Sequence, residues 1–194
     1  FPSDTVSPGL SFRRRDTLLG SVAMATAAGG SAVDQAAAAS ASADVDFRYW
    51  RLWVSADGHT HLTPSTMSGF EEVGYSKSPQ AVREKGIPPP RKVVFTELPA
   101  QFDNPWHFCP ASQFVTVQRG QWWVKTTDGS KQRLGPNDVL YQDNTSDIMD
   151  KLKDGSSALI EHAGQHCSGT DGETCQQIII QVDREPCVGE KVPF

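Results

Sequence analysis

Four residues in the middle of the chain, His107, Cys109, Gln113 and Gly120, follow one another at intervals of two, four and seven positions. Residues two or four positions apart in a β-strand point to the same face of a sheet, so the spacing predicts one shared face for the first three. The runs before and after Gly120 are rich in β-branched and aromatic residues. Arg119-Gly120 therefore predicts a hairpin turn between two strands, with Gly120 at positive φ.

The chain from residue 44 onward has the pattern of short strands separated by turns. Asp128-Gly129 predicts a tight turn, and residues 65–91, which are polar and contain four prolines, predict a long loop. No long helical period occurs, so the pattern predicts one all-β domain, a sandwich or barrel. The expected strands are 48–54, 92–97, 113–118, 121–127, 139–142, 158–161 and 176–182.

Residues 106–120 resemble the first motif of the cupin family, G-x5-H-x-H-x3-4-E-x6-G. His107 occupies the first His position, Cys109 replaces the second His and Gln113 replaces the Glu. Residues 135–139, GPNDV, resemble the PGD turn of the second cupin motif, with Asn137 in the Gly position, and Asn also tolerates positive φ. The resemblance implies a single-domain, jelly-roll-like cupin β-barrel over about residues 47–183.

A subgroup of small cupins has the same order of elements as this chain, from the early DGHTH at 57–61 to the late GQH at 164–166. This resemblance implies that His61, His107, Gln113 and His166 converge inside the barrel, with Trp106 as a wall, and bind a small polar or organic molecule. Trp122 and Trp123 are further candidates for a wall. Adjacent strand residues point to opposite faces, so only one of these two can line the interior.

A metal site is the second hypothesis for the same residues. The family's metal ligands are two His and a Glu, and the loss of the Glu charge at Gln113 weakens such a site. An ionised thiol at Cys109 would restore one charge and favour a softer transition metal, held by His107, Cys109 and His166. The competing interpretation is that Cys109 is a small buried hydrophobic residue and Gln113 a hydrogen-bonded polar group.

The first 43 residues have the features of a targeting leader. Arg13-Arg14-Arg15 precedes a short apolar run and an Ala-Ser-Ala sequence at 41–43, the order found in twin-arginine export signals. Cleavage is expected at residue 43 or 39. The Phe-Pro-Ser start resembles a plastid transit peptide of algae with complex plastids, which implies the thylakoid lumen of the chloroplast; a bacterial periplasm is the alternative. The apolar run is too short for a transmembrane span.

The cysteine count is even, at four, and in an exported domain this permits disulfides. Cys167 and Cys175 bracket a polar, Gly-containing segment, so a bridge between them is the first pairing that we expect.

The charge balance of 18 Lys and Arg against 23 Asp and Glu gives a net charge of −5 and no basic footprint for nucleic acid. The sequence leaves three classes of function: a noncatalytic cupin that binds a small molecule, a metal-dependent oxygenase or isomerase, and an accessory subunit of a photosynthetic membrane complex on its lumenal side.

Overall fold

The computed structural model describes residues 45–153, 159–190 and 194, so the expected leader, residues 1–43, lies outside the described residues. The regular secondary structure of the described part is all strand except for one short helix, and the expected all-β class is confirmed. In chain order the elements are β1 (Phe47–Val54), β2 (Thr60–Met67), β3 (Glu71–Val73), β4 (Gln80–Val82), β5 (Pro90–Leu98), β6 (Asp103–His107), β7 (Gln113–Arg119), β8 (Trp122–Thr126), β9 (Lys131–Leu134), β10 (Val139–Gln142), α1 (Ile148–Lys153), β11 (His166–Gly169) and β12 (Cys175–Val182).

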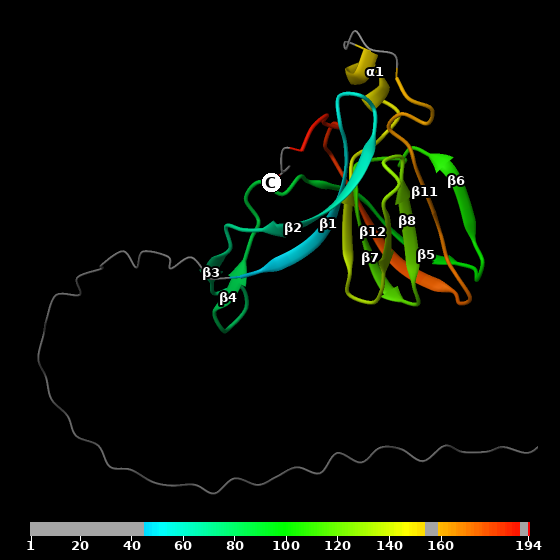
Figure 1. Ribbon diagram of the computed structural model, residues 1–194. Helices are drawn as coiled ribbons and strands as arrows, with labels where there is room; N and C mark the ends of the chain where they lie inside the picture. Colours follow the sequence, from blue (N-terminus) through cyan, green and yellow to red (C-terminus); the bar gives the residue numbers. More distant parts are fainter. Residues whose placement is uncertain (1–44, 154–158, 191–193) are drawn as a thin grey trace, which may run out of the picture. The chain divides into compact units, whose positions relative to one another are not determined.

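The strands form a six-stranded sheet in the order β2-β1-β10-β7-β12-β5 and a four-stranded sheet in the order β6-β11-β8-β9 (Figure 1). Neighbouring strands are antiparallel except β1 and β10, which run parallel. Within the described residues the two sheets do not join into a closed barrel. A short hairpin of β3 and β4 forms a third sheet in the segment that the sequence predicted to be loop.

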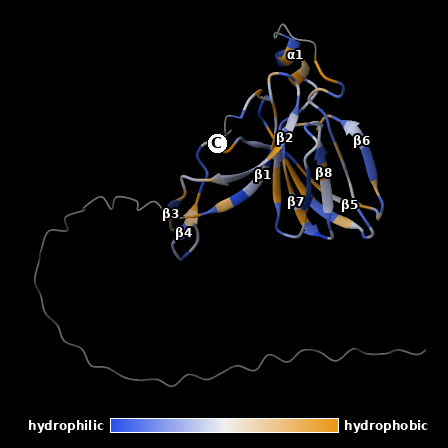
Figure 2. Ribbon diagram, in the orientation of Figure 1, coloured by the Kyte–Doolittle hydropathy of each residue, from blue (hydrophilic) through white to orange (hydrophobic). Residues whose placement is uncertain are grey.

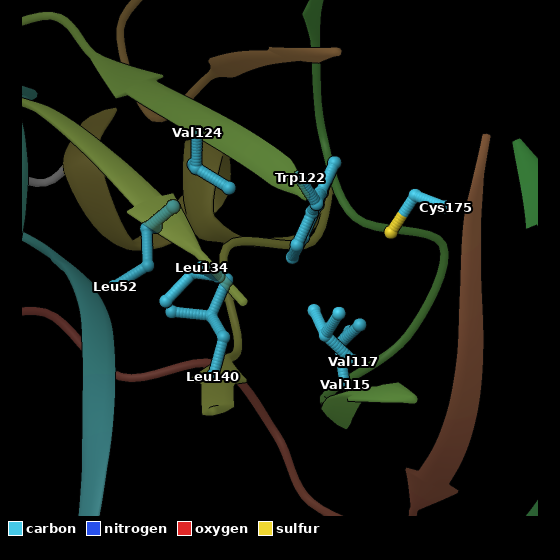
Figure 3. Packing of buried hydrophobic residues seen from close by; sticks show 8 residues of the cluster. All are labelled: Leu52, Val115, Val117, Trp122, Val124, Leu134, Leu140 and Cys175. Atoms are coloured by element: carbon cyan, nitrogen blue, oxygen red, sulfur yellow. The ribbon is translucent and has the colours of Figure 1, made fainter. Parts of the chain in front are cut away.

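The core lies between the two larger sheets. Its main cluster combines Leu52, Val115, Val117, Leu140 and Cys175 from the six-stranded sheet with Trp122, Val124 and Leu134 from the four-stranded one, and these side chains point toward one another (Figure 3). Hydrophobic segments are visible along β1 and β7 (Figure 2). The residues of this cluster range from Leu52 on β1 to Cys175 on β12, so burial of apolar surface joins parts of the chain that are distant in sequence.

Gly120 does not lie in a hairpin, which corrects the expected pairing of its two flanking strands. β7 belongs to the larger sheet and β8 to the smaller, so the chain changes sheets at this glycine. Its φ of 74° confirms the expected positive value. A Cβ at this position would also collide with the carbonyl oxygen of Thr174, so both the backbone conformation and the space demand glycine.

Two other turns have the expected form. Asp128 and Gly129 join β8 to β9 in an antiparallel hairpin, with Gly129 at a φ of 89°. Asn137 has a φ of 74° in the turn from β9 to β10, where Asp138 Oδ2 accepts from the Gly135 N–H at 2.7 Å. An amide residue thus takes the left-handed conformation that Gly usually supplies.

The expected strand at 158–161 is not formed in the described residues 159–161, and residue 158 lies outside the described part. Leu159 and Ile160 pack instead against Ile148 and Leu152 of α1 in a small separate cluster. The described residues contain no helix long and apolar enough to cross a membrane.

Candidate functional site

A cavity of about 450 Å³ lies between the two sheets. The larger sheet contributes alternate residues of β5, β7 and β12 to its wall, as expected where successive side chains point to opposite faces. Apolar wall residues include Val94, Leu98, Val115 and Ile179, and Lys92 lies exposed at the rim. The volume is within the range of small-molecule sites in proteins.

The smaller sheet contributes the polar residues Asn104, His107, His166 and Ser168. Asn104 and His107 are three positions apart and would point to opposite faces of a regular strand. The register of β6 against β11 shifts between them, because two residues, Pro105 and Trp106, stand opposite one residue of β11. This irregularity has the form of a β-bulge, and it allows both Asn104 and His107 to face the cavity. Pro105 has no N–H to donate to a neighbouring strand, and it is tolerated in this bulge of an edge strand because no such hydrogen bond is required there.

His107 and His166 are direct partners across β6 and β11, and their ring centroids are 4.2 Å apart. His107 Nδ1–H donates to the Pro105 carbonyl oxygen at 2.7 Å, since a carbonyl can only accept. Its other ring nitrogen, Nε2, accepts from Asn104 Nδ2 at 3.0 Å. Both nitrogens of His107 are therefore engaged within the protein.

His166 is fully buried, and burial, with a smaller contribution from His107, lowers its pKa from 6.5 to about 3. Asn144 Nδ2 donates to the Gly164 carbonyl at 2.9 Å and to His166 Nδ1 at 2.9 Å. The neutral ring therefore has its proton on Nε2, which leaves one N–H donor that an occupant of the cavity could use.

Cys109 and Gln113 also line the cavity. The spacing predicted that they share a strand with His107, and this prediction is wrong. β6 ends at His107, and β7 begins at Gln113 in the opposite sheet. The chain bends between them around Pro110, so the even intervals place these side chains across the cavity from one another rather than along one strand face. Burial, with a smaller contribution from Asp143, raises the pKa of the Cys109 thiol, which therefore stays neutral.

The residues brought together do not suit a metal. The described residues hold no group of three His, Cys, Asp or Glu side chains placed to bind a metal ion. In the set of His107, Cys109 and His166, the thiol is held in its neutral form and both nitrogens of His107 already have protein partners. A metal would have to deprotonate this buried thiol and displace Asn104 from His107 Nε2, so the donor set fits a metal poorly.

His61 lies on β2, outside the residues that line the cavity. Its Nδ1 donates to Asp128 Oδ2 at 2.9 Å, and its Nε2 contacts Ser55 Oγ at 2.9 Å. The contacts resemble a Ser-His-Asp triad, but Ser55 Oγ–H has a closer acceptor in Asp57 Oδ1 at 2.5 Å. The Ser55 N–H donates to the His59 carbonyl and is not free to stabilise an oxyanion. We interpret this network as a clasp that ties the β1–β2 turn to the β8–β9 turn.

Trp106 also lies outside the cavity lining, because it is one of the two residues of the bulge in β6. Its ring stacks on His162, with centroids 5.1 Å apart. The tryptophan that lines the cavity is Trp122, while Trp123 lies under Lys131 Nζ at 3.9 Å. The two adjacent tryptophans thus point to opposite faces, as the strand geometry predicted.

Three buried polar atoms of lining residues have no hydrogen-bond partner among the described residues: Trp122 Nε1, Gln142 Oε1 and Gln177 Nε2. A buried unpaired polar group costs about 1–3 kcal/mol, so such atoms often mark contacts made by a bound molecule or by water. Gln142 was not a site candidate from sequence. Its position beside the buried Asp143-Asn144 pair at the end of β10 is the only signal that could have found it.

All four cysteines are free thiols, so the expected Cys167–Cys175 bridge is not formed. Cys175 is fully buried in the core cluster between the sheets. Cys167 lies on β11 between His166 and Ser168, both of which face the cavity, so its own side chain points to the other face of that sheet. The two sulfurs are thus directed to different sides of the smaller sheet.

No model of a known protein family matches the chain, and no curated protein matches it in sequence. Among solved structures, one that resembles it is the crystal structure of protein NMB1881 from Neisseria meningitidis. The two are 13% identical, the match covers 53% of this chain and 90% of that chain, and the TM-score is 0.30. A similarity this low supports no argument about function. The fold and the site define an all-β protein with a cavity between its two larger sheets.

Proposed function

We propose that the protein is a cupin-like binding protein that holds a small organic monocarboxylate in the cavity between its sheets, without metal catalysis. The observation that supports this most is the composition of the wall. Lys92 is the only Lys, Arg, Asp or Glu among the described residues that line the cavity. The other polar groups are neutral amides, two hydroxyls, a thiol, an indole N–H and imidazoles, and the remainder of the wall is apolar.

This composition selects the ligand by charge and shape. A cation would lose hydration without gaining an anionic partner, and a polyanion would find only one cation. A monocarboxylate with an apolar body suits the wall, because its head can contact the Lys92 ammonium at the rim while its body lies against Val94, Leu98 and Ile179. His166 Nε2–H and Trp122 Nε1–H are further donors that could reach an oxygen of the ligand.

Calorimetric titration of the full chain with benzoate, benzamide and unbranched monocarboxylates of increasing length tests the proposal. We expect benzoate or one of the longer acids to bind. Lys92→Gln should lower the affinity for that acid by about tenfold and leave the affinity for benzamide unchanged. Lys125→Gln is the matched control, because Lys125 is exposed on β8 and does not line the cavity. A protein that binds no acid of the series would contradict the proposal.

Two variants on adjacent positions of β12 test the location of binding. Ile179 faces the cavity, whereas Ile178 faces the outer side of the sheet. Ile179→Trp should fill the cavity and abolish binding, while Ile178→Trp should bind as the wild type does. Equal binding by both variants, each shown to be folded by circular dichroism, would place the ligand elsewhere.

The metal-dependent oxygenase or isomerase is the weaker proposal, because the donor set fits a metal poorly. Elemental analysis of the purified full chain separates the two. One equivalent of tightly bound transition metal, lost in His107→Ala and His166→Ala, would favour the metal-dependent reaction over simple ligand binding.

A further inference from the structure

β5 forms one edge of the six-stranded sheet. β12 pairs with it on one side, and no strand pairs with its other side in the described part of the chain. It is also nine residues long, whereas natural edge strands are commonly short or blunted by bulges. A long unpaired edge exposes backbone N–H and C=O groups that another strand can use, so β5 has the form of an association site.

The outer face of this edge is apolar. Lys92, Val94, Thr96 and Leu98 face the cavity, so the alternate residues point outward. Val93 is 53% exposed and Phe95 is 77% exposed, which is unusual for such large apolar side chains.

The neighbouring strands extend this apolar face. On β12, Ile178 is opposite Phe95 and Ile180 is opposite Val93. On β7, Phe114 continues the row from Ile180. Apolar side chains thus form a contiguous surface that runs inward from the free edge, and a contiguous exposed apolar surface of this kind marks an interface.

The charges on the same face identify the partner. Arg91 and Glu97 flank the apolar pair, each two positions from it. If two copies of β5 pair antiparallel about Val94, Arg91 of one lies opposite Glu97 of the other and Val93 lies opposite Phe95. Val94 is also the midpoint of the strand, so every residue from Pro90 to Leu98 gains a partner. The edge is therefore complementary to itself in charge, in apolar character and in length.

The present partners of the two charges are weak competitors. Arg91 Nη1 is 3.7 Å from Asp183 Oδ1, and both side chains are about two-thirds exposed. Glu97 Oε2 accepts from Gln176 Nε2 at 2.7 Å, an exposed contact that leaves the other carboxylate oxygen available. Exposed contacts of this kind contribute little to stability, so exchanging them for an intermolecular pair is inexpensive.

We propose that the protein is a two-fold homodimer formed by antiparallel pairing of β5 with β5 of a second copy, centred on Val94. The two six-stranded sheets then continue into one sheet, and the outer apolar faces join across the axis. A closed two-fold contact of this type satisfies both edges at once and leaves none free for further addition. The proposal does not depend on a ligand in the cavity.

Sedimentation equilibrium of the full chain over a range of concentrations tests the dimer. We expect twice the chain mass of 21.1 kDa for the wild type. Phe95→Lys should shift the protein to monomer without loss of fold, because Phe95 is an exposed side chain. Tyr75→Lys is the matched control, since Tyr75 is 67% exposed between β3 and β4, outside the sheet that contains β5, and should leave the dimer intact. A monomeric wild type at every concentration would overturn the proposal.

Charge reversal tests the register. Arg91→Glu and Glu97→Arg each place like charges opposite one another at both ends of the interface, and each should weaken dimerisation by about tenfold. An equimolar mixture of the two variants should recover wild-type affinity, because both ends of the mixed dimer then have opposite charges. The double variant should also recover it. A dimer that is indifferent to both single changes, or is disrupted only by Tyr75→Lys, would show that the copies meet through a different surface.

Discussion

His107 and His166 lie opposite one another across β6 and β11, with ring centroids 4.2 Å apart, yet the two imidazoles have different surroundings. His107 is partly exposed at the cavity and His166 is fully buried. Two positive imidazoles at this distance would repel each other in a region of low dielectric. The structure holds His166 neutral, with its proton directed by Asn144 to Nε2.

The buried His166 should make stability depend on pH. Its pKa is about 3 in the folded protein and 6.5 in the reference state, so between these values the unfolded chain binds the proton and the folded one does not. The free energy of unfolding should therefore be highest above pH 6.5 and should fall as the pH falls toward 3. The loss should be a few kcal/mol at most, the energy that corresponds to the lowering of the His166 pKa. Urea unfolding at a series of pH values gives the free energy of unfolding as a function of pH. The slope of this dependence should be shallower for His166→Gln than for wild type. His162→Gln, at an exposed site, should keep the wild-type slope.

Gly120→Val should destabilise the fold by about 3 kcal/mol or more, because it adds a β-branched side chain at positive φ and a clash with the Thr174 carbonyl. Gly129→Val is the control, with a φ of 89° but no atom within 4 Å of the added Cβ. It should cost only the backbone strain, about 1–2 kcal/mol. Thermal or urea unfolding measures both, and equal losses would show that the clash is absent.

The clasp around His61 should act on stability alone. His61→Ala should lower the free energy of unfolding by about 1 kcal/mol, because it removes the hydrogen bonds to Asp128 and Ser55. A double-mutant cycle with Asp128→Ala should give a coupling energy of about 0.5–1 kcal/mol. Monocarboxylate affinity should be the same in all four proteins. A loss of affinity in His61→Ala would return His61 to the ligand site.

Export by the twin-arginine route stays a prediction from the sequence. Changing Arg14 and Arg15 to Lys together should leave the precursor uncut, whereas Arg48→Lys in the β-domain should not affect processing. Mass spectrometry of the cleaved product should place its first residue at 44 or at 40. Normal processing of the Arg14 and Arg15 variant would argue against this signal.

Local chemistry explains the parts of the fold that could be predicted. Runs of β-forming residues bounded by turn residues located β1, β5, β7, β8, β10 and β12 to within a few residues. Gly120, Asn137 and the Asp128-Gly129 turn have their expected conformations, because φ preferences are properties of the residue itself. β2, β3, β4, β6, β9 and β11 were missed, since polar strands such as Lys131–Leu134 have no strong hydrophobic pattern.

The site was predicted only in part for a related reason. His107, Gln113 and His166 do line one cavity, although the argument from intervals along one strand was wrong. They meet because the chain passes from the smaller sheet to the larger one near Pro110, which places residues of the two sheets on opposite walls of the cavity. The bulge at Pro105 and Trp106 then turns Trp106 away from the cavity and keeps His107 facing it.

The sequence by itself determined where most strands and turns lie and which residues alternate, because these follow from backbone preferences and from side-chain polarity over a few residues. Only the tertiary structure decided which sheet each strand joins, which histidines meet, that Cys175 packs into the core, and that β5 remains an unpaired edge. These outcomes depend on long-range burial and on strand pairing between distant segments. No local interval in the chain encodes them.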